Sequence, residues 1–231
     1  MKEVKINCLD ERNIPYVIIR KKVKSFRLKI DDKGIVKITY PYLTKEESLI
    51  KFVEKHIAWI IEKRKIVKSN EVLYENDSVH YVFGEKCILK INYSKTTRVD
   101  KVGNIIMVST SKLDNIRNIM LKWRMELSEM VFKEILFKSF NVMEKNLKQF
   151  PELIVKTSKT KWGCCYINQN KIMLNLALTQ VPFYLIEYVI YHELVHFLVK
   201  NHSKEFHEIL QKFVPNERNF SKELKKYTNR I

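Results

Sequence analysis

The sequence is poor in the residues that interrupt or cross-link a fold. Its 231 residues include only four glycines, five prolines and four cysteines. Because 45% of the residues are hydrophobic and no repeat or low-complexity linker is present, a disordered chain and a repeat array are both excluded. The chain is long enough to bury a substantial core, as one domain or as two small ones.

The four cysteines do not form the pattern of a disulfide framework. Cys164 and Cys165 are adjacent, and adjacent cysteines rarely form an unstrained bridge. Cys8 and Cys87 complete no zinc-finger spacing with them. We therefore expect reduced thiols, as in the cytoplasm.

Long apolar runs are also missing from the sequence. No stretch of about 18 apolar residues is present, so we expect no membrane-spanning helix. Residues 1–8 lack the apolar core of a signal peptide, which argues against secretion. Both observations favour a cytoplasmic protein.

Acidic residues are outnumbered along the whole chain. There are 43 lysines and arginines against 26 aspartates and glutamates, a formal net charge of +17. Residues 1–110 carry net +9 (23 basic, 14 acidic) and residues 111–231 carry net +8 (20 basic, 12 acidic), so the excess is not a basic tail. Such a charge favours contact with nucleic acid, ribosomes or acidic proteins. A lysine-rich source proteome is an equally good explanation.

Alternating apolar residues predict strands in the first part of the chain. Residues 4–40 have the pattern of antiparallel strands, with a hairpin turn at 31–34. A capping box at 44–47 opens a helix that is predicted to run to about residue 65, with Trp59 in the core. Strand patterns return over 79–109.

Helical spacing dominates the second part of the chain. A long helical pattern covers 111–148, and since it exceeds a usual helix, a break within it is an alternative. The elements predicted after it are strands at 152–158 and 171–176, a helix after Pro182, a second helix ending near Lys212 and a basic helix from Glu217. The fold class expected from this order is α+β.

The run His192-Glu193-Leu194-Val195-His196 is the most specific signal in the sequence. Two histidines four residues apart lie one turn apart on one face of a helix, so both imidazoles can bind one Zn²⁺. Glu193 then lies beside a zinc-bound water and can accept its proton. Burying these groups without a partner is costly, and a metal ion removes that cost. A core helix with hydrogen-bonded histidines is the alternative.

His202 is the expected third ligand. Its spacing from His196 is that of the pattern HExxHxxGxxH, in which the glycine turns the chain sharply. Val199 stands at the glycine position, but Lys200-Asn201 follows, and asparagine tolerates the left-handed conformation that ends helices. We therefore expect the helix to stop near Lys200. His207, in the next helix, is the rival ligand, with a surface or outer-shell position as its alternative.

Four motifs follow one another between Lys161 and His207. They are Lys161-Trp162-Gly163-Cys164-Cys165, Ile172-Met173-Leu174-Asn175, Tyr188 to His196, and Asn201-His202-Ser203 with Phe206. In this order they resemble the YgjP-like metallopeptidases, a bacterial family of the zincin group related in pattern to SprT-like and WLM domains.

The resemblance implies a zincin-like fold in which three histidines bind zinc and a glutamate is the general base. Two residues depart from the family's usual pattern. Cys164 stands where serine is usual, and His207 stands where tryptophan is usual. A thiol nucleophile at Cys164 or Cys165 is the alternative to a structural turn beside the zinc site. The residues to which the resemblance assigns roles are His192, His196, His202 and Glu193.

These observations predict a zinc-dependent hydrolase that cleaves peptide bonds. The ion lowers the pKa of its bound water towards about 7, and Glu193 accepts the proton and passes it to the leaving amine. The oxyanion needs a further donor, for which Tyr188 and Lys161 are candidates, with packing or surface positions as alternatives. In zincins generally an edge strand pairs with substrate, and the strand at 171–176 is the candidate, unless it is an ordinary core strand.

Residues 111–231 are expected to form the zincin-like catalytic domain, and residues 1–110 a strand-rich accessory region. Its net charge suggests that the accessory region recruits substrate, which is a protein, a peptide or a protein bound to nucleic acid. Two other functions stay open: a nucleic-acid-associated protein with structural zinc, and a zinc hydrolase with a non-peptide substrate. A structural site needs four protein ligands, and His207 is the one candidate near His202.

Overall fold

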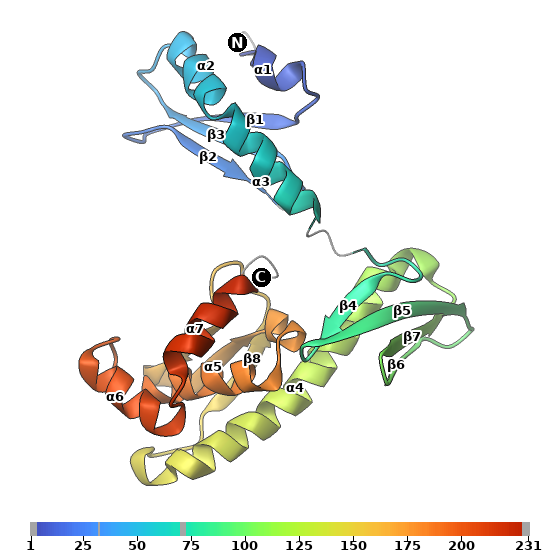
Figure 1. The fold of residues 1–231 in the computed structure, drawn as a ribbon, viewed down its shortest axis with the longest axis vertical. Coiled ribbons are helices and arrows are strands. Elements are labelled where there is room, and N and C mark those ends of the chain that lie inside the picture. The colour runs from blue at the N-terminus through green and yellow to red at the C-terminus, as the bar shows by residue number, and fades with distance from the viewer. Residues whose placement is uncertain (1–3, 32, 70–72, 228–231) are drawn as a thin grey trace. The chain divides into compact units, whose positions relative to one another are not determined.

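The computed structural model describes residues 4–31, 33–69 and 73–227. They belong to two compact units, Met1–Glu71 and Val72–Ile231 (Figure 1). The boundary that the sequence predicted near residue 110 lies inside the second unit. It does so because the strands before this position pack their apolar side chains against the long helix that follows it.

The first unit is a three-stranded sheet with helices. Its strand order is β1-β3-β2, with β2 antiparallel to β3 as predicted. The expectation that all strands are antiparallel is wrong for β1, which is parallel to β3. The chain reverses direction between β1 and β2 and again between β2 and β3, so the first and third strands run the same way. The elements are α1 (Asn7–Asp10), β1 (Tyr16–Lys21), β2 (Arg27–Ile30), β3 (Val36–Pro41), α2 (Glu46–Lys55) and α3 (Ile57–Ser69).

One face of this sheet packs against the helices, and the predicted single helix is divided in two. The backbone leaves helical geometry at His56 (φ −106°, ψ 9°), whose Nδ1 lies 2.8 Å from the carbonyl oxygen of Phe52. After this break α3 buries Ile60 and turns Trp59 outward, so Trp59 is 42% exposed and the core position predicted for it is wrong. The buried core consists of Ile6, Leu9, Ile14, Val36, Ile38, Tyr40, Leu49, Val53 and Ile60.

The second unit begins with a four-stranded sheet that packs against a long helix. The strand order is β4-β5-β7-β6. The helix is continuous over 28 residues, without the break considered above, and follows a 3₁₀ turn at Leu113–Asn115. These elements are β4 (Val79–Val82), β5 (Glu85–Tyr93), β6 (Arg98–Val102), β7 (Ile105–Thr110) and α4 (Ile116–Met143).

A second, three-stranded sheet and three helices complete this unit (Figure 1). Two strands and three helices of this part are confirmed, whereas the strand β9 was not predicted. The strand order is β8-β10-β9, so β10 is the central strand and the edge position expected for 171–176 is wrong. The elements are β8 (Glu152–Lys156), β9 (Gly163–Tyr166), β10 (Lys171–Asn175), a 3₁₀ helix (Leu176–Gln180), α5 (Phe183–Val195), α6 (Lys204–Phe213) and α7 (Glu217–Lys226).

A buried arginine connects the two halves of the second unit. Arg124 of α4 is 6% exposed, and its Nη1 donates to the carbonyl oxygen of Tyr81 (3.0 Å) and to Oγ1 of Thr179 (3.2 Å). Close by, the backbone N–H of Phe83 donates to the carbonyl oxygen of Thr179 over 2.7 Å. The α+β architecture is therefore confirmed, with both sheets of this unit tied to one helix.

Within the described residues, none of the helices combines the length and the apolar character that crossing a bilayer requires.

The helix that carries the HExxH motif, α5, lies in the largest core of the second unit. It packs against α4, β9, α6 and α7.

Candidate metal centre

The helix α5 holds the motif at its buried C-terminal end. It ends at Val195, earlier than expected, and His196 is already its C-cap. The left-handed conformation expected at Asn201 does not occur, because Asn201 is not among the positive-φ residues of the described chain. Instead, consecutive backbone N–H groups after His196 bond back to the carbonyls of Leu194 and Val195. This tight turn needs no glycine, which explains how Val199 fills the glycine position.

Three imidazoles come together where the chain turns back towards α5 after His196. One ligand atom each of His192, His196 and His202 lies within 4.8 Å of the others. The Nε2 atoms of His192 and His202 are 2.9 Å apart. Two nitrogens at about 2.0–2.1 Å from one tetrahedral zinc ion are about 3.3 Å apart, so this pair is nearly at ligand spacing.

A buried phenylalanine supports all three rings. Phe206 of α6 is fully buried, and its ring centroid lies 4.7–4.9 Å from those of His192, His196 and His202. The Nδ1 of His196 lies 3.2 Å from the carbonyl oxygen of Val199, which leaves its Nε2 free for a ligand. The rings are thus held in place by the fold.

The lowered pKa values of two of these histidines suit a metal ion. Burial, with the neighbouring His196 and His202 as smaller causes, lowers the pKa of His192 to about 3. Burial also lowers the pKa of His196, although its bond to the Val199 carbonyl opposes the shift. Neutral imidazole is the form that binds metals, so the lowered pKa values of His192 and His196 favour binding of an ion such as Zn²⁺.

Glu193 lies beside this group and is almost fully enclosed. It is 6% exposed, and burial raises the pKa of its carboxyl group to about 7. A hydrogen bond from the Cys165 backbone N–H and the charge of Lys161 oppose this rise. The neighbour on the other side is Gly163, where a Cβ atom would lie 2.6 Å from Glu193 Oε1.

The loop that brings Gly163 to this position is fixed by a buried asparagine. The side chain of Asn175 donates to the carbonyl oxygens of Ser158 and Lys161, each over 2.8 Å, and accepts from the Ala177 backbone N–H at 3.1 Å. Its backbone N–H donates to the carbonyl oxygen of Trp162. The sequence did not predict these roles of Asn175 and Gly163. Both residues were identified there only as members of the four motifs, without a function of their own.

The two candidate oxyanion donors lie in different environments. Tyr188 is 7% exposed, its hydroxyl is hydrogen-bonded to Ser221, and burial raises its pKa. This contact with α7 favours the packing interpretation for Tyr188. The exposed Lys161 lowers the pKa of Glu193, so its charge acts on the base.

The two adjacent cysteines of β9 flank the same site. Burial, and then the charge of Glu193, raises the pKa of the Cys165 thiol to about 12. The Sγ of Cys164 lies 3.9 Å from Nζ of Lys161. Both thiols are free, as expected.

His207, the rival ligand, lies elsewhere. Among the described residues it is not part of the group formed by the three histidines. Its Nδ1 lies 3.1 Å from Oε1 of Glu217, whose side chain is 4% exposed, and Nε2 of Gln211 donates to the same oxygen over 3.5 Å. This contact gives His207 a structural partner of its own.

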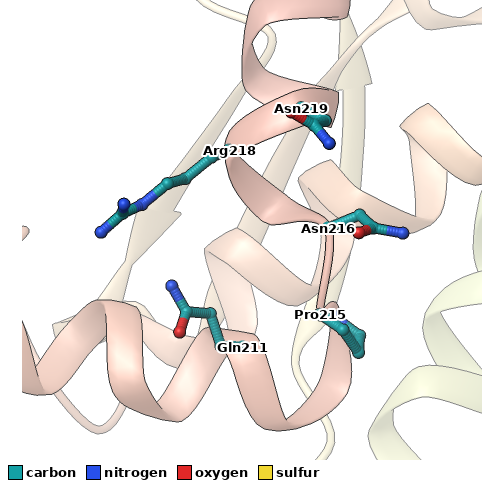
Figure 2. Close-up of a pocket in the computed structure, with 5 residues that line it drawn as sticks. All are labelled: Gln211, Pro215, Asn216, Arg218 and Asn219. Carbon is teal, nitrogen blue, oxygen red and sulfur yellow. The ribbon is translucent and has the colours of Figure 1, made fainter.

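Figure 2 shows a separate polar pocket at the turn between α6 and α7. Its lining residues are Gln211, Pro215, Asn216, Arg218 and Asn219. None of the three clustered histidines lines it, so it is distinct from the candidate metal centre.

Comparison with known proteins identifies the family of this chain. The model of the YgjP-like family, described as a metallopeptidase domain, matches residues 24–227. A similar solved structure is the crystal structure of the metallopeptidase zymogen jannalysin from Methanocaldococcus jannaschii. It is 23% identical, covers 41% of this chain and 94% of that chain, and has a TM-score of 0.37. No curated protein matches the sequence. Since the family match includes all four motifs and most of the sequence, the chain belongs to the YgjP-like metallopeptidase family.

Proposed function

We propose that this protein is a zinc-dependent metallopeptidase. In this proposal His192, His196 and His202 bind the ion and Glu193 is the general base. The observation that carries it is the convergence of three imidazoles beside a buried carboxylate whose pKa is raised to about 7. Family membership supports metallopeptidase chemistry.

The number of donors supports a catalytic rather than a structural ion. Structural zinc sites are closed by four protein ligands, whereas catalytic sites keep one position open. In the described chain the group contains three histidines, and the nearest further candidate, His207, contacts Glu217 instead. The proposal of a structural zinc therefore has less support.

The bound ion supplies a water of lowered pKa and polarises the scissile carbonyl. Glu193 accepts the proton of the attacking water and delivers it to the leaving amine. A carboxyl group with a pKa near 7 is suited to both steps at neutral pH. Lys161 places a positive charge beside the reacting groups, and we propose it as the residue that stabilises the oxyanion.

The substrate that fits this chemistry is a protein or a peptide. The experiment uses untagged full-length protein, metal analysis and the hydrolysis of fluorescein-labelled casein. We expect about one zinc per chain in the native protein and none in the His192→Ala, His196→Ala double variant. Zinc retained in full by the double variant would disprove the ligand assignment.

The base is tested separately from the metal. Glu193→Gln keeps the shape and the ion but is expected to lower hydrolysis on the order of 10²-fold or more. Glu187→Gln, on an exposed position of the same helix, is the matched control and leaves both readouts unchanged. Undiminished hydrolysis by Glu193→Gln would contradict the role of this residue.

A further inference from the structure

The positive charge of the N-terminal region is concentrated in the first unit. Residues 1–71 contain 18 basic and 10 acidic residues (net +8), whereas residues 72–110 contain five and four (net +1). Between residues 13 and 30 no acidic residue occurs. The six cations of this segment are Arg20, Lys21, Lys22, Lys24, Arg27 and Lys29.

Several of these cations lie on the sheet face that is turned away from the helices. In β3 the buried residues Val36, Ile38 and Tyr40 point into the core, so Lys37 and Thr39 lie on the opposite face. The strand register extends this face to the neighbouring strands, because paired residues share a face. We define the open face by Val17, Ile19, Lys21, Arg27, Lys29, Lys37, Thr39 and Pro41.

Within the residues that the structure describes, one of the four cations of the open face has an acidic partner. Lys37 contacts Asp31 over 3.1 Å. No ion pair of Lys21, Arg27 or Lys29 occurs in the described part of the chain. Moreover, Lys29 lies directly opposite Lys37 in the antiparallel pair of β2 and β3. Like charges at such a position repel each other, so the unit carries an unfavourable arrangement that an anion would relieve.

A lysine-rich composition alone does not explain this arrangement, since most strand cations in the four-stranded sheet of the second unit have acidic partners. There, Lys101 pairs with Glu85 and Arg98 pairs with Asp100, each over 2.7 Å. Both sheets come from one sequence and therefore share the same compositional bias. Among the described residues, three of the four strand cations of the four-stranded sheet are ion-paired, with Lys86 as the exception, whereas one of the four cations of the open face is.

We propose that the open face of the first unit binds the phosphate backbone of double-helical nucleic acid. Cations two residues apart on a strand are about 6.6 Å apart, and neighbouring strands are about 4.8 Å apart, so the face offers a grid of positive charges. The strand residues of this face include no aromatic ring on which an unpaired base could stack. Binding is therefore through phosphates and independent of sequence. This inference does not depend on the proposed peptidase activity.

The experiment measures binding of the full-length protein to a fluorescein-labelled DNA duplex of about 20 base pairs by anisotropy. Each phosphate contact contributes about 0.9 to the slope of log Kd against log salt. We expect a slope of about 3 to 4 for the native protein, corresponding to the four cations of the face. The triple variant Lys21→Gln, Arg27→Gln, Lys29→Gln is expected to lower the slope by about 2.7 and to weaken binding at low salt at least about tenfold.

A charge-matched control distinguishes the effect of the open face on binding from the effect of the net charge of the protein. The variant Lys86→Gln, Lys95→Gln, Lys133→Gln removes three exposed cations of the second unit and keeps binding within about twofold. Equal weakening by both triple variants would overturn the proposal, and so would unchanged binding by the face variant. Tighter binding to vesicles with about 30% phosphatidylserine than to the duplex would also overturn it.

A stability measurement distinguishes binding from a structural role. Because Lys29 opposes Lys37, the single variant Lys29→Gln is expected to melt at the same or a higher temperature while its duplex affinity falls. Lys29→Arg keeps the charge and is expected to keep the affinity. A variant that loses stability and affinity together would show that Lys29 is needed for folding and would overturn its assignment to the face.

Discussion

Gly163 of β9 provides the space that the Glu193 side chain occupies. A Cβ atom on Gly163 would lie 2.6 Å from Oε1, 2.8 Å from Cγ and 2.9 Å from Cδ of Glu193. These distances are shorter than van der Waals contact, so any other residue at position 163 displaces the carboxylate. The strand thereby determines where the candidate base lies.

Gly163→Ala is expected to lower hydrolysis at least about tenfold, because the added methyl group displaces the base from the reacting water. The zinc content stays unchanged, since the histidines are not touched. Gly103→Ala is the control, because nothing lies within 4 Å of its Cβ position, although its φ of +56° makes that variant less stable. Full activity of Gly163→Ala would show that the carboxylate tolerates displacement.

The two histidines near the α6 helix are expected to differ in their effect on zinc. His202→Ala removes a member of the clustered group and is expected to weaken zinc binding by more than about 100-fold. His207→Ala removes a partner of Glu217 and is expected to change it by less than about threefold. A competition titration with a chelator measures both, and the reverse ranking would exchange their roles.

The cysteines of β9 are expected to be dispensable for hydrolysis. With its pKa raised to about 12, the thiol of Cys165 is ionised in only about one molecule in 10⁵ at pH 7. The double variant Cys164→Ser, Cys165→Ser should therefore keep the rate within about threefold. It also restores the serine that the family usually has at position 164. A complete loss of hydrolysis with unchanged zinc content would support a thiol nucleophile instead.

Acid is expected to destabilise the second unit through a buried histidine. Burial, and then the charge of Arg124, lowers the pKa of His80 from 6.5 to about 4. Below pH 6.5 the unfolded chain binds a proton at His80 that the folded unit does not accept until about pH 4. The stabilisation is complete above pH 6.5 and is lost as the pH falls towards 4, on the order of 3 kcal/mol in all.

The measurement is urea unfolding between pH 7 and 4 in a Trp59→Phe background, so that Trp123 and Trp162 report on the second unit alone. His80→Phe removes the titrating group and is expected to flatten the pH dependence. An unchanged pH dependence in His80→Phe would assign the acid sensitivity to other groups.

The parts of the site that depend on local geometry could be predicted from the sequence. Two histidines four residues apart lie on one face of any helix, so His192 and His196 needed no tertiary information. The position of His202 could be predicted from its spacing from His196. The turn before it, however, is formed by backbone hydrogen bonds and not by an asparagine in the left-handed conformation. The environment of Glu193 depends on Gly163, which is distant in sequence and belongs to a four-residue strand with no alternating pattern.

The architecture was harder to predict where long-range pairing decides it. Strand alternation identified β1 and β3 but contains no information on their relative direction. That direction depends on β2, which pairs antiparallel with β3 while β1 pairs parallel with it. The division between the units follows from packing of β4–β7 on α4, and periodicity alone does not reveal which elements share a core.

The hydrogen bonds of Arg124 have an evolutionary consequence. Its buried guanidinium group donates to the backbone carbonyl oxygen of Tyr81 in β4 and to the Thr179 hydroxyl after β10, so both segments are needed to accept from it. A gene fusion or truncation that separated the chain near residue 110 would leave this cation without partners in an apolar interior. We therefore expect the four strands before α4 to be inherited together with the helices that carry the histidine cluster, and recombination to exchange modules at the boundary between the two units.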